Sequence, residues 1–244
     1  MTDPQPLQPQ PERYPFWDWL DLAVMFALAL PLILLMLAGG GGAPHPPKSI
    51  PRHTAMLAVA VTFSLYGLWF LALSLLLRLR YDRPFWRSLA CVWPPRGFWH
   101  SAACGVLLAM ASLLLGVALR IPETKTPLEE LLKDRASILL IGVFGVTLGP
   151  LCEELIFRGF LMPLLARSFG ALAGVLLAAL PFALLHGQEY AWGWKQLAIV
   201  FLAGAAFGWM RHRSGSTAAA AVMHGAYNLV FFVMLAALKT GVAG

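Results

Sequence analysis

The sequence predicts an all-α, polytopic membrane protein, a transmembrane bundle of seven to eight helices around an intramembrane polar cavity. Hydrophobic residues make up 59% of the 244 residues and charged residues only 12%, about half the charged share of a soluble domain. Several apolar runs reach the ~20 residues that cross a bilayer as a helix. No segment shows the alternating pattern of a barrel strand.

The N-terminal stretch MTDPQPLQPQPERYPFW is rich in Pro and Gln and carries an acidic residue near its start. A secretory signal would place basic residues directly before an apolar run. We therefore predict a disordered tail over residues 1–17, followed by a single transmembrane domain over 18–244. Trp17 and Trp19 stand where an interfacial aromatic belt would begin.

Seven apolar runs follow along the chain, separated by loops. They span about 19–37, 54–77, 98–119, 137–166, 171–186, 195–210 and 217–238. The first ends in GGGGAPHPP, which predicts a flexible loop. The third is followed by the charged segment IPETKTPLEELLKDRAS, in which Pro127 before LEELL predicts a short surface helix.

Two local features bear on the number of spans and on their orientation. Proline removes a helix hydrogen bond, so Gly149-Pro150 predicts a kink or break that would give eight spans instead of seven. Between the second and third spans lie five arginines with one aspartate among them. The positive-inside rule places that loop, residues 78–97, in the cytoplasm.

Three ionisable residues interrupt the oily segment LCEELIFRGFL, residues 151–161. An ionised side chain at the bilayer centre costs roughly 2.5–3.5 kcal/mol, so charge there indicates function by default. Glu154 and Arg158 are four residues apart on one helix face, which predicts that they neutralise one another. Glu153 is rotated about 100° away, so it must be protonated or find partners on other helices. A purely structural network would explain the pair but not Glu153.

Later spans carry candidate partners for Glu153. Phe182 and His186 lie four apart in PFALLH, and His224 and Asn228 are one turn apart in AVMHGAYNLVFF. A lone histidine at a helix end is more often a hydrogen-bonded bystander. Together with the glutamates, however, these residues offer a carboxylate to take a proton, an imidazole to orient water and donors for an oxyanion. The set predicts acyl transfer to water.

The three motifs E-E-x-x-x-R (153–158), F-x-x-x-H (182–186) and H-x-x-x-N (224–228) occur in this order on successive predicted helices. This arrangement resembles the CAAX prenyl protease 2 family, within the wider group of CAAX proteases and bacteriocin-processing enzymes. The resemblance covers Pro150 to Asn228, with a catalytic core expected at 137–239. It implies an intramembrane glutamate-type endopeptidase with an active-site cavity among its helices.

The resemblance also implies a role for each motif residue. Glu153 would act as the base, His186 would orient the water, and His224 with Asn228 would stabilise the oxyanion. Supporting roles fall to Glu154, Arg158 and Phe182. The substrate would be a membrane-bound peptide or protein, although nothing in the chain reads as a prenyl-recognition signature.

A zinc-dependent variant is an open alternative, because Glu153, His186 and His224 could form a two-His, one-carboxylate site. The sequence has no HExxH motif, and no second-shell partners can be identified from it. Its three cysteines are scattered and form no CxxC pair, which argues against a zinc knuckle or a disulfide framework. We therefore favour a mechanism without metal or cofactor.

Two other classes of function remain open. A non-catalytic membrane scaffold or immunity-type protein would keep the fold, although no motif residue is lost. A proton-coupled transporter fits less well, because the chain shows no inverted repeat. The net charge of +6 reflects arginines at helix ends more than nucleic-acid binding. We expect a multi-pass protein of a bacterial plasma membrane, with the lipid bilayer and a peptide or protein substrate as partners.

Overall fold

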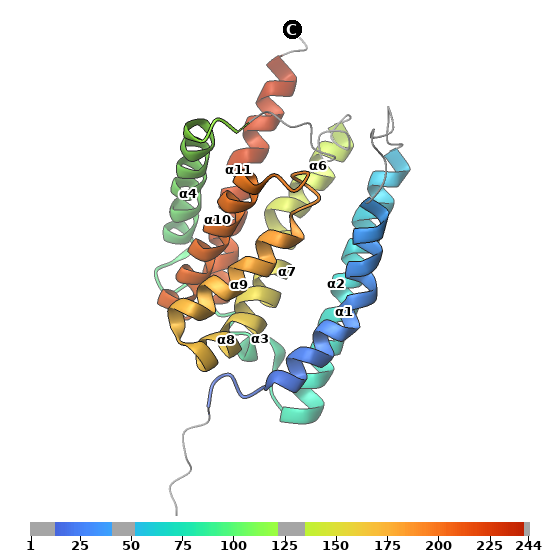
Figure 1. The fold of residues 1–244 in the computed structure, drawn as a ribbon, viewed down its shortest axis with the longest axis vertical. Helices are drawn as coiled ribbons and strands as arrows, with labels where there is room; N and C mark the ends of the chain where they lie inside the picture. The colour runs from blue at the N-terminus through green and yellow to red at the C-terminus, as the bar shows by residue number, and fades with distance from the viewer. Residues whose placement is uncertain (1–12, 41–51, 122–134, 242–244) are drawn as a thin grey trace, which may run out of the picture.

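The computed structural model describes residues 13–40, 52–121 and 135–241, which form a helical bundle (Figure 1). The N-terminal helices α1 (Trp19–Gly40) and α2 (Arg52–Tyr81) run side by side at one flank of the bundle and are followed by the short α3 (Phe85–Ser88). The other elements are α4 (Phe98–Ala118), α6 (Arg135–Val143), η1 (Phe144–Leu148), α7 (Gly149–Glu154), η2 (Leu155–Leu161), α8 (Met162–Phe169), α9 (Ala171–Leu185), α10 (Trp194–Ser214) and α11 (Thr217–Gly241).

The predicted class, a helical membrane bundle, is confirmed. Within the described residues, four helical stretches are long and apolar enough to cross a bilayer: Phe63–Tyr81, Phe98–Ala118, Leu139–Phe169 and Thr217–Ala237. Two further apolar helices are shorter, Trp19–Leu30 and Ala171–Leu185. The GGGGAPHPP loop and the predicted surface helix near Pro127 lie outside the described residues.

The run that contains Gly149-Pro150 is one continuous helical stretch, so of the predicted kink or break a break is excluded. The stretch contains two π-helical turns, η1 before α7 and η2 after it. The N–H of Gly149 donates to the carbonyl of Phe144, and that of Met162 donates to Phe157, five residues back in each case. Pro150 is the second residue after η1 and has no N–H to donate to a carbonyl of that turn. The seven-span version of the prediction fits this stretch.

The predicted disordered tail covers residues 1–17. Residues 1–12 lie outside the described residues, and the end of the predicted tail packs against the bundle. Trp17 is fully buried, and its indole Nε1 donates to the carbonyl of Phe160 at 3.1 Å. It stacks on the ring of Phe160, with 5.3 Å between the centroids. Placing Trp17 in an interfacial belt was therefore wrong, whereas the exposed Trp19 fits that position.

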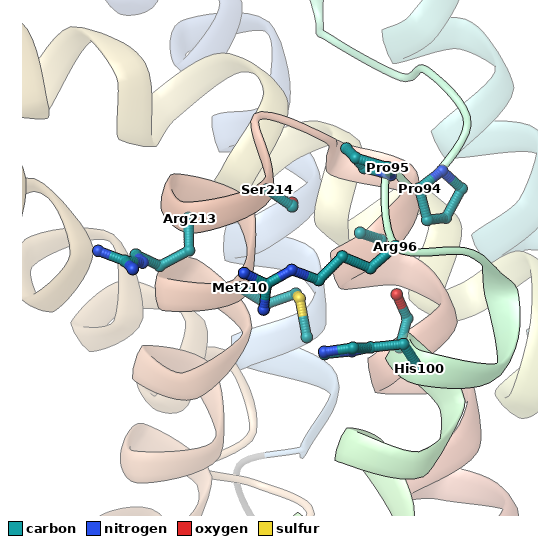
Figure 2. Close-up of a pocket in the computed structure, with 9 residues that line it drawn as sticks. Pro94, Pro95, Arg96, His100, Met210, Arg213 and Ser214 are labelled. Carbon is teal, nitrogen blue, oxygen red and sulfur yellow. The ribbon is translucent and has the colours of Figure 1, made fainter.

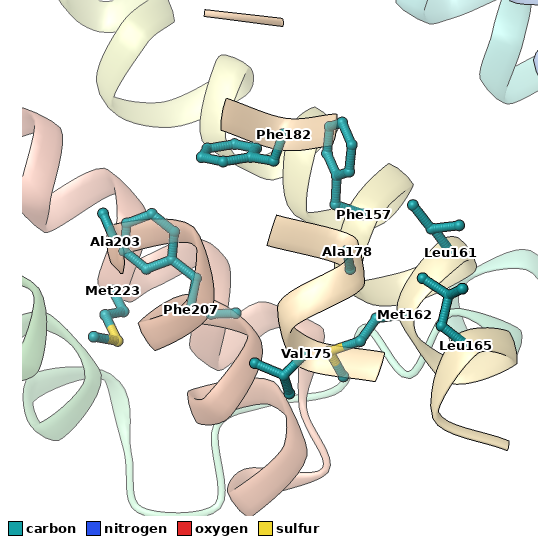
Figure 3. Close-up of a cluster of buried hydrophobic side chains, with 11 residues drawn as sticks. Phe157, Leu161, Met162, Leu165, Val175, Ala178, Phe182, Ala203, Phe207 and Met223 are labelled. Atoms are coloured by element: carbon teal, nitrogen blue, oxygen red, sulfur yellow. The ribbon is translucent and has the colours of Figure 1, made fainter. Parts of the chain in front are cut away.

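Two apolar clusters hold the bundle together. One joins η2, α8, α9, α10 and α11 through side chains such as Phe157, Phe182 and Phe207 (Figure 3). The other joins Trp17 and α1 to α2, η2 and α8. Helix α4 packs closely on α11 because Gly105 has no side chain: a Cβ there would lie 2.9 Å from the Cβ of Ala226.

Candidate active site

A buried ion pair occupies the middle of the motif helix. The guanidinium of Arg158 donates from Nη1 to Oε1 of Glu154 at 2.8 Å, and both side chains are fully buried. Nδ1 of His224 lies 3.0 Å from the same oxygen. The contact predicted from the four-residue spacing is present, and the structure adds an imidazole from α11 to it.

The rest of the Arg158 guanidinium is held by α10 and by aromatic rings. Its Nη2 donates to the carbonyl of Gly204 at 2.7 Å, and its carbon lies 4.4 Å from the ring centroid of Phe182. A Cβ at Gly204 would lie 2.9 Å from the Phe182 ring and 3.1 Å from Nη2. Glycine therefore lets α10 approach closely enough to bind the cation, and Phe182 is a packing partner of the ion pair.

Glu153 lies one position earlier, on the adjacent face of α7, and has a different environment. Its side chain keeps 24% of its surface exposed, and Oε2 lies 3.9 Å from Nε2 of His224. This distance is too long for a direct hydrogen bond and suits a bridge through one small polar group. His224 therefore faces both glutamates, one through each ring nitrogen.

His186 directly follows α9, the helix that also carries Phe182. Its Nδ1 lies 2.8 Å from the carbonyl of Phe182, and the ring of Phe182 lies 4.8 Å from His186 and 5.8 Å from His224. A carbonyl and a carboxylate can only accept hydrogen bonds. Nδ1 of both histidines must therefore carry hydrogen, and Nε2 of each ring is left for other partners.

Asn228 is tied to the π-helical turn before the glutamates. Its Nδ2 donates to the carbonyl of Gly145 at 2.8 Å. The N–H of Gly149, four residues further, donates to Phe144 instead, and Pro150 at the next position has no N–H. Asn228 thus satisfies a carbonyl that the π turn leaves without a backbone donor, and it keeps one N–H for another acceptor.

Two residues at the cluster could not be assigned from sequence. Phe207 of α10 stacks on the His224 ring, with 4.4 Å between the centroids and 19° between the planes. Glu189 lies three residues after His186 in a turn closed by hydrogen bonds such as Tyr190 N–H to the His186 carbonyl. Burial raises the pKa of Glu189; His186 opposes this rise, and Glu153 adds to it. The only indication in the sequence that Glu189 lies near the motif residues is its position three residues after His186.

The zinc alternative requires Glu153, His186 and His224 to converge on one ion. Among residues 13–40, 52–121 and 135–241, no group of three or more His, Cys, Asp and Glu side chains is arranged to hold a metal ion. Glu153, His186 and His224 do not form such a group. Nδ1 of each histidine is already hydrogen-bonded, so only Nε2 of each ring could bind a metal.

The fold and the site together define a multi-pass helical membrane protein with a buried carboxylate–imidazole cluster. Residues 135–230 match the family model described as type II CAAX prenyl endopeptidase Rce1-like. The match contains all seven motif residues and begins after α4, so the predicted resemblance to the CAAX protease family is confirmed. At the family level it implies CAAX-type intramembrane protease activity. No curated protein and no solved structure matches the chain significantly.

Proposed function

We propose that this protein is an intramembrane endopeptidase that hydrolyses a membrane-bound peptide or protein, using water activated by Glu153. The observation that carries the proposal is the pair formed by Glu153 and His224, whose Oε2 and Nε2 lie 3.9 Å apart beside a fully buried ion pair. A water molecule between them would hydrogen-bond to both groups. The partial exposure of Glu153 fits a base that must reach solvent and substrate.

In the proposed reaction, Glu153 takes a proton from the water, and the hydroxide oxygen attacks the carbonyl carbon of the scissile peptide bond. The carbonyl oxygen becomes an oxyanion, which accepts hydrogen bonds from the second N–H of Asn228 and from Nε2 of a protonated His224. Nε2 of His186 accepts from the water and orients it. Collapse of the tetrahedral intermediate breaks the C–N bond, and Glu153 returns the proton to the leaving amine.

The supporting residues keep these groups in place. Glu154 accepts from Nδ1 of His224, and Arg158 holds Glu154 against α10. Such second partners set the tautomer and the orientation of a catalytic imidazole. We assign the reaction no metal or cofactor, because the proposed chemistry needs only water. We place the protein in a bacterial plasma membrane.

The proposal is tested by comparing the C-terminal peptides of membranes that contain wild-type protein or the Glu153→Gln variant. Loss of a general base lowers the rate by about 10²–10⁴-fold, so peptides made by the wild type should be absent with the variant. Asp82→Asn makes the same acid-to-amide change at an exposed loop position and should leave the peptides unchanged. His224→Ala should give the same loss as Glu153→Gln.

The rival functions predict different outcomes of the same experiment. A scaffold would tolerate both Glu153→Gln and His224→Ala, and a proton-coupled carrier would show them as uptake defects with unchanged peptides. Either result would refute the peptidase. Cleavage that is lost with a chelator and restored by zinc would instead replace the metal-free mechanism by the zinc-dependent one.

A further inference from the structure

A hollow of about 100 Å³ lies between α4, the segment before it, and α10 (Figure 2). Its lining includes Arg96 and His100 at the start of α4, with Met210 and Arg213 in the last turns of α10. Figure 2 shows the side chains of Arg96 and His100 both directed toward Met210, while the side chain of Arg213 extends away from them. The hollow belongs to the arginine-bearing end of the bundle and is not part of the motif cluster.

Arg96 and Arg213 have no acidic partner in the part of the chain that the structure describes. None of the described residues that line the hollow is acidic, and no ion pair within the described part of the chain involves Arg96 or Arg213. Other arginines at the same end are satisfied by the protein: Arg80 by Asp18 and Arg211 by Thr217. The first turn of α4 adds to the positive potential, because its N-cap residue provides no side-chain acceptor and its first N–H groups point outward.

Aromatic side chains beside the hollow place it at the membrane–water boundary. Trp93 and Trp99, which flank Arg96 in sequence, expose 75% and 81% of their surfaces. Exposed tryptophans of a membrane protein collect at the level of the lipid head groups. An anion bound in this hollow would therefore lie at the depth of a lipid phosphate.

Apolar stripes lead from the hollow along both helices. On α4, Leu107 and Leu114 follow His100 at intervals of seven residues and are exposed, so all three share one helix face. On α10, exposed Trp209 and Leu202 precede Arg213 by four and eleven residues, again on one face. Each stripe offers a lipid-facing surface for an acyl chain next to a residue that lines the hollow.

We propose that this hollow binds the phosphate of an anionic phospholipid, with Arg96 and His100 as its main contacts and Arg213 at the rim. Basic hollows between membrane helices are suited to such head groups, and a guanidinium can donate two hydrogen bonds to one phosphate. The exposed apolar stripes favour a lipid over free phosphate, which has nothing to place on them. The site is independent of the proposed peptidase reaction.

The test measures binding of spin-labelled phosphatidylglycerol to the full-length protein in phosphatidylcholine vesicles. The wild type should prefer it to spin-labelled phosphatidylcholine, and Arg96→Gln should weaken its binding about tenfold, the worth of a charge-assisted hydrogen bond. Arg213→Gln should have a smaller effect. Arg96→Lys, which keeps the charge, should retain part of the preference and show that the variants fold.

Arg87→Gln is the matched control, because Arg87 is an exposed arginine at the same end of the bundle but outside the hollow. It should bind phosphatidylglycerol like the wild type. An equal loss of phosphatidylglycerol binding with Arg87→Gln and Arg96→Gln would mean that net charge alone explains the effect. That result would overturn the proposed site. Equal binding of the two lipids would also overturn it, as would displacement of the labelled lipid by millimolar inorganic phosphate.

Discussion

Two arginine–carboxylate networks in this molecule use the same chemistry in opposite surroundings. Arg158 meets Glu154 deep in the bundle, where both side chains are fully buried. Arg80, at the end of α2, meets Asp18 at 3.1 Å, with 43% and 48% of the two side chains exposed. It also pairs with the buried Asp21.

The two networks differ in whether water can solvate a charge that is left behind when its partner is removed. Around Arg80, solvent screens the charges and can hydrate the exposed Asp18 if the arginine is lost, and the buried Asp21 has other hydrogen-bond donors. Around Arg158, removal of one partner leaves a buried charge with nothing to solvate it. The buried network therefore carries the larger energetic consequence. It also positions His224, whereas the exposed network ties the start of α1 to α2.

The sharpest test of this contrast is Arg158→Met, which keeps the length of the side chain and removes its charge. Breaking a buried pair costs about 3–5 kcal/mol, so we expect a large loss of stability and no cleavage. Thermal unfolding of the purified protein in detergent measures the first, and the peptide comparison measures the second. A melting temperature close to that of the wild type would show that Glu154 is not left as an uncompensated charge.

The double variant Glu154→Met/Arg158→Met separates stability from positioning. Replacing both partners removes the buried charges together, so it should be more stable than Arg158→Met alone. It should remain inactive, since Nδ1 of His224 loses its acceptor. Activity in a well-folded double variant would contradict the positioning role.

A smaller effect, with a defined dependence on pH, is expected from Glu189→Gln. Because burial raises the pKa of Glu189, the folded protein binds this proton more tightly than the unfolded chain. Stability should therefore fall as pH rises from about 4.3, the ordinary glutamate value, through the raised pKa. Unfolding measured across this range should show the decline in the wild type but a weaker one in Glu189→Gln. A variant less stable than the wild type at neutral pH would contradict the prediction.

The smallest effect is expected from Arg80→Gln. Its exposed partner Asp18 is also held by backbone N–H groups, those of Leu20 and Asp21, and the buried Asp21 keeps hydrogen bonds from the Asp18 N–H and the Tyr81 hydroxyl. The shift in melting temperature should be several-fold smaller than for Arg158→Met and should shrink further in high salt. A shift as large as that of Arg158→Met would remove the distinction between the two networks.

Local spacing predicted much of this molecule. The helical spans follow from apolar runs of sufficient length, and the Glu154–Arg158 contact follows from a four-residue interval on one helix. Trp17 was misplaced because its burial depends on Phe160, 143 residues away. The sequence left seven or eight spans open, because continuity of the helix through Pro150 depends on a π turn and on partners outside it, such as Asn228 for the Gly145 carbonyl.

The sequence by itself determined the class of protein, the helices and the motif residues, because composition and periodicity act over short stretches of chain. Only the tertiary structure decided that His224 bonds to Glu154 and faces Glu153 at 3.9 Å. Distances between helices depend on how side chains such as Gly105 and Gly204 let backbones approach. That information belongs to the packing of distant segments and has no local pattern.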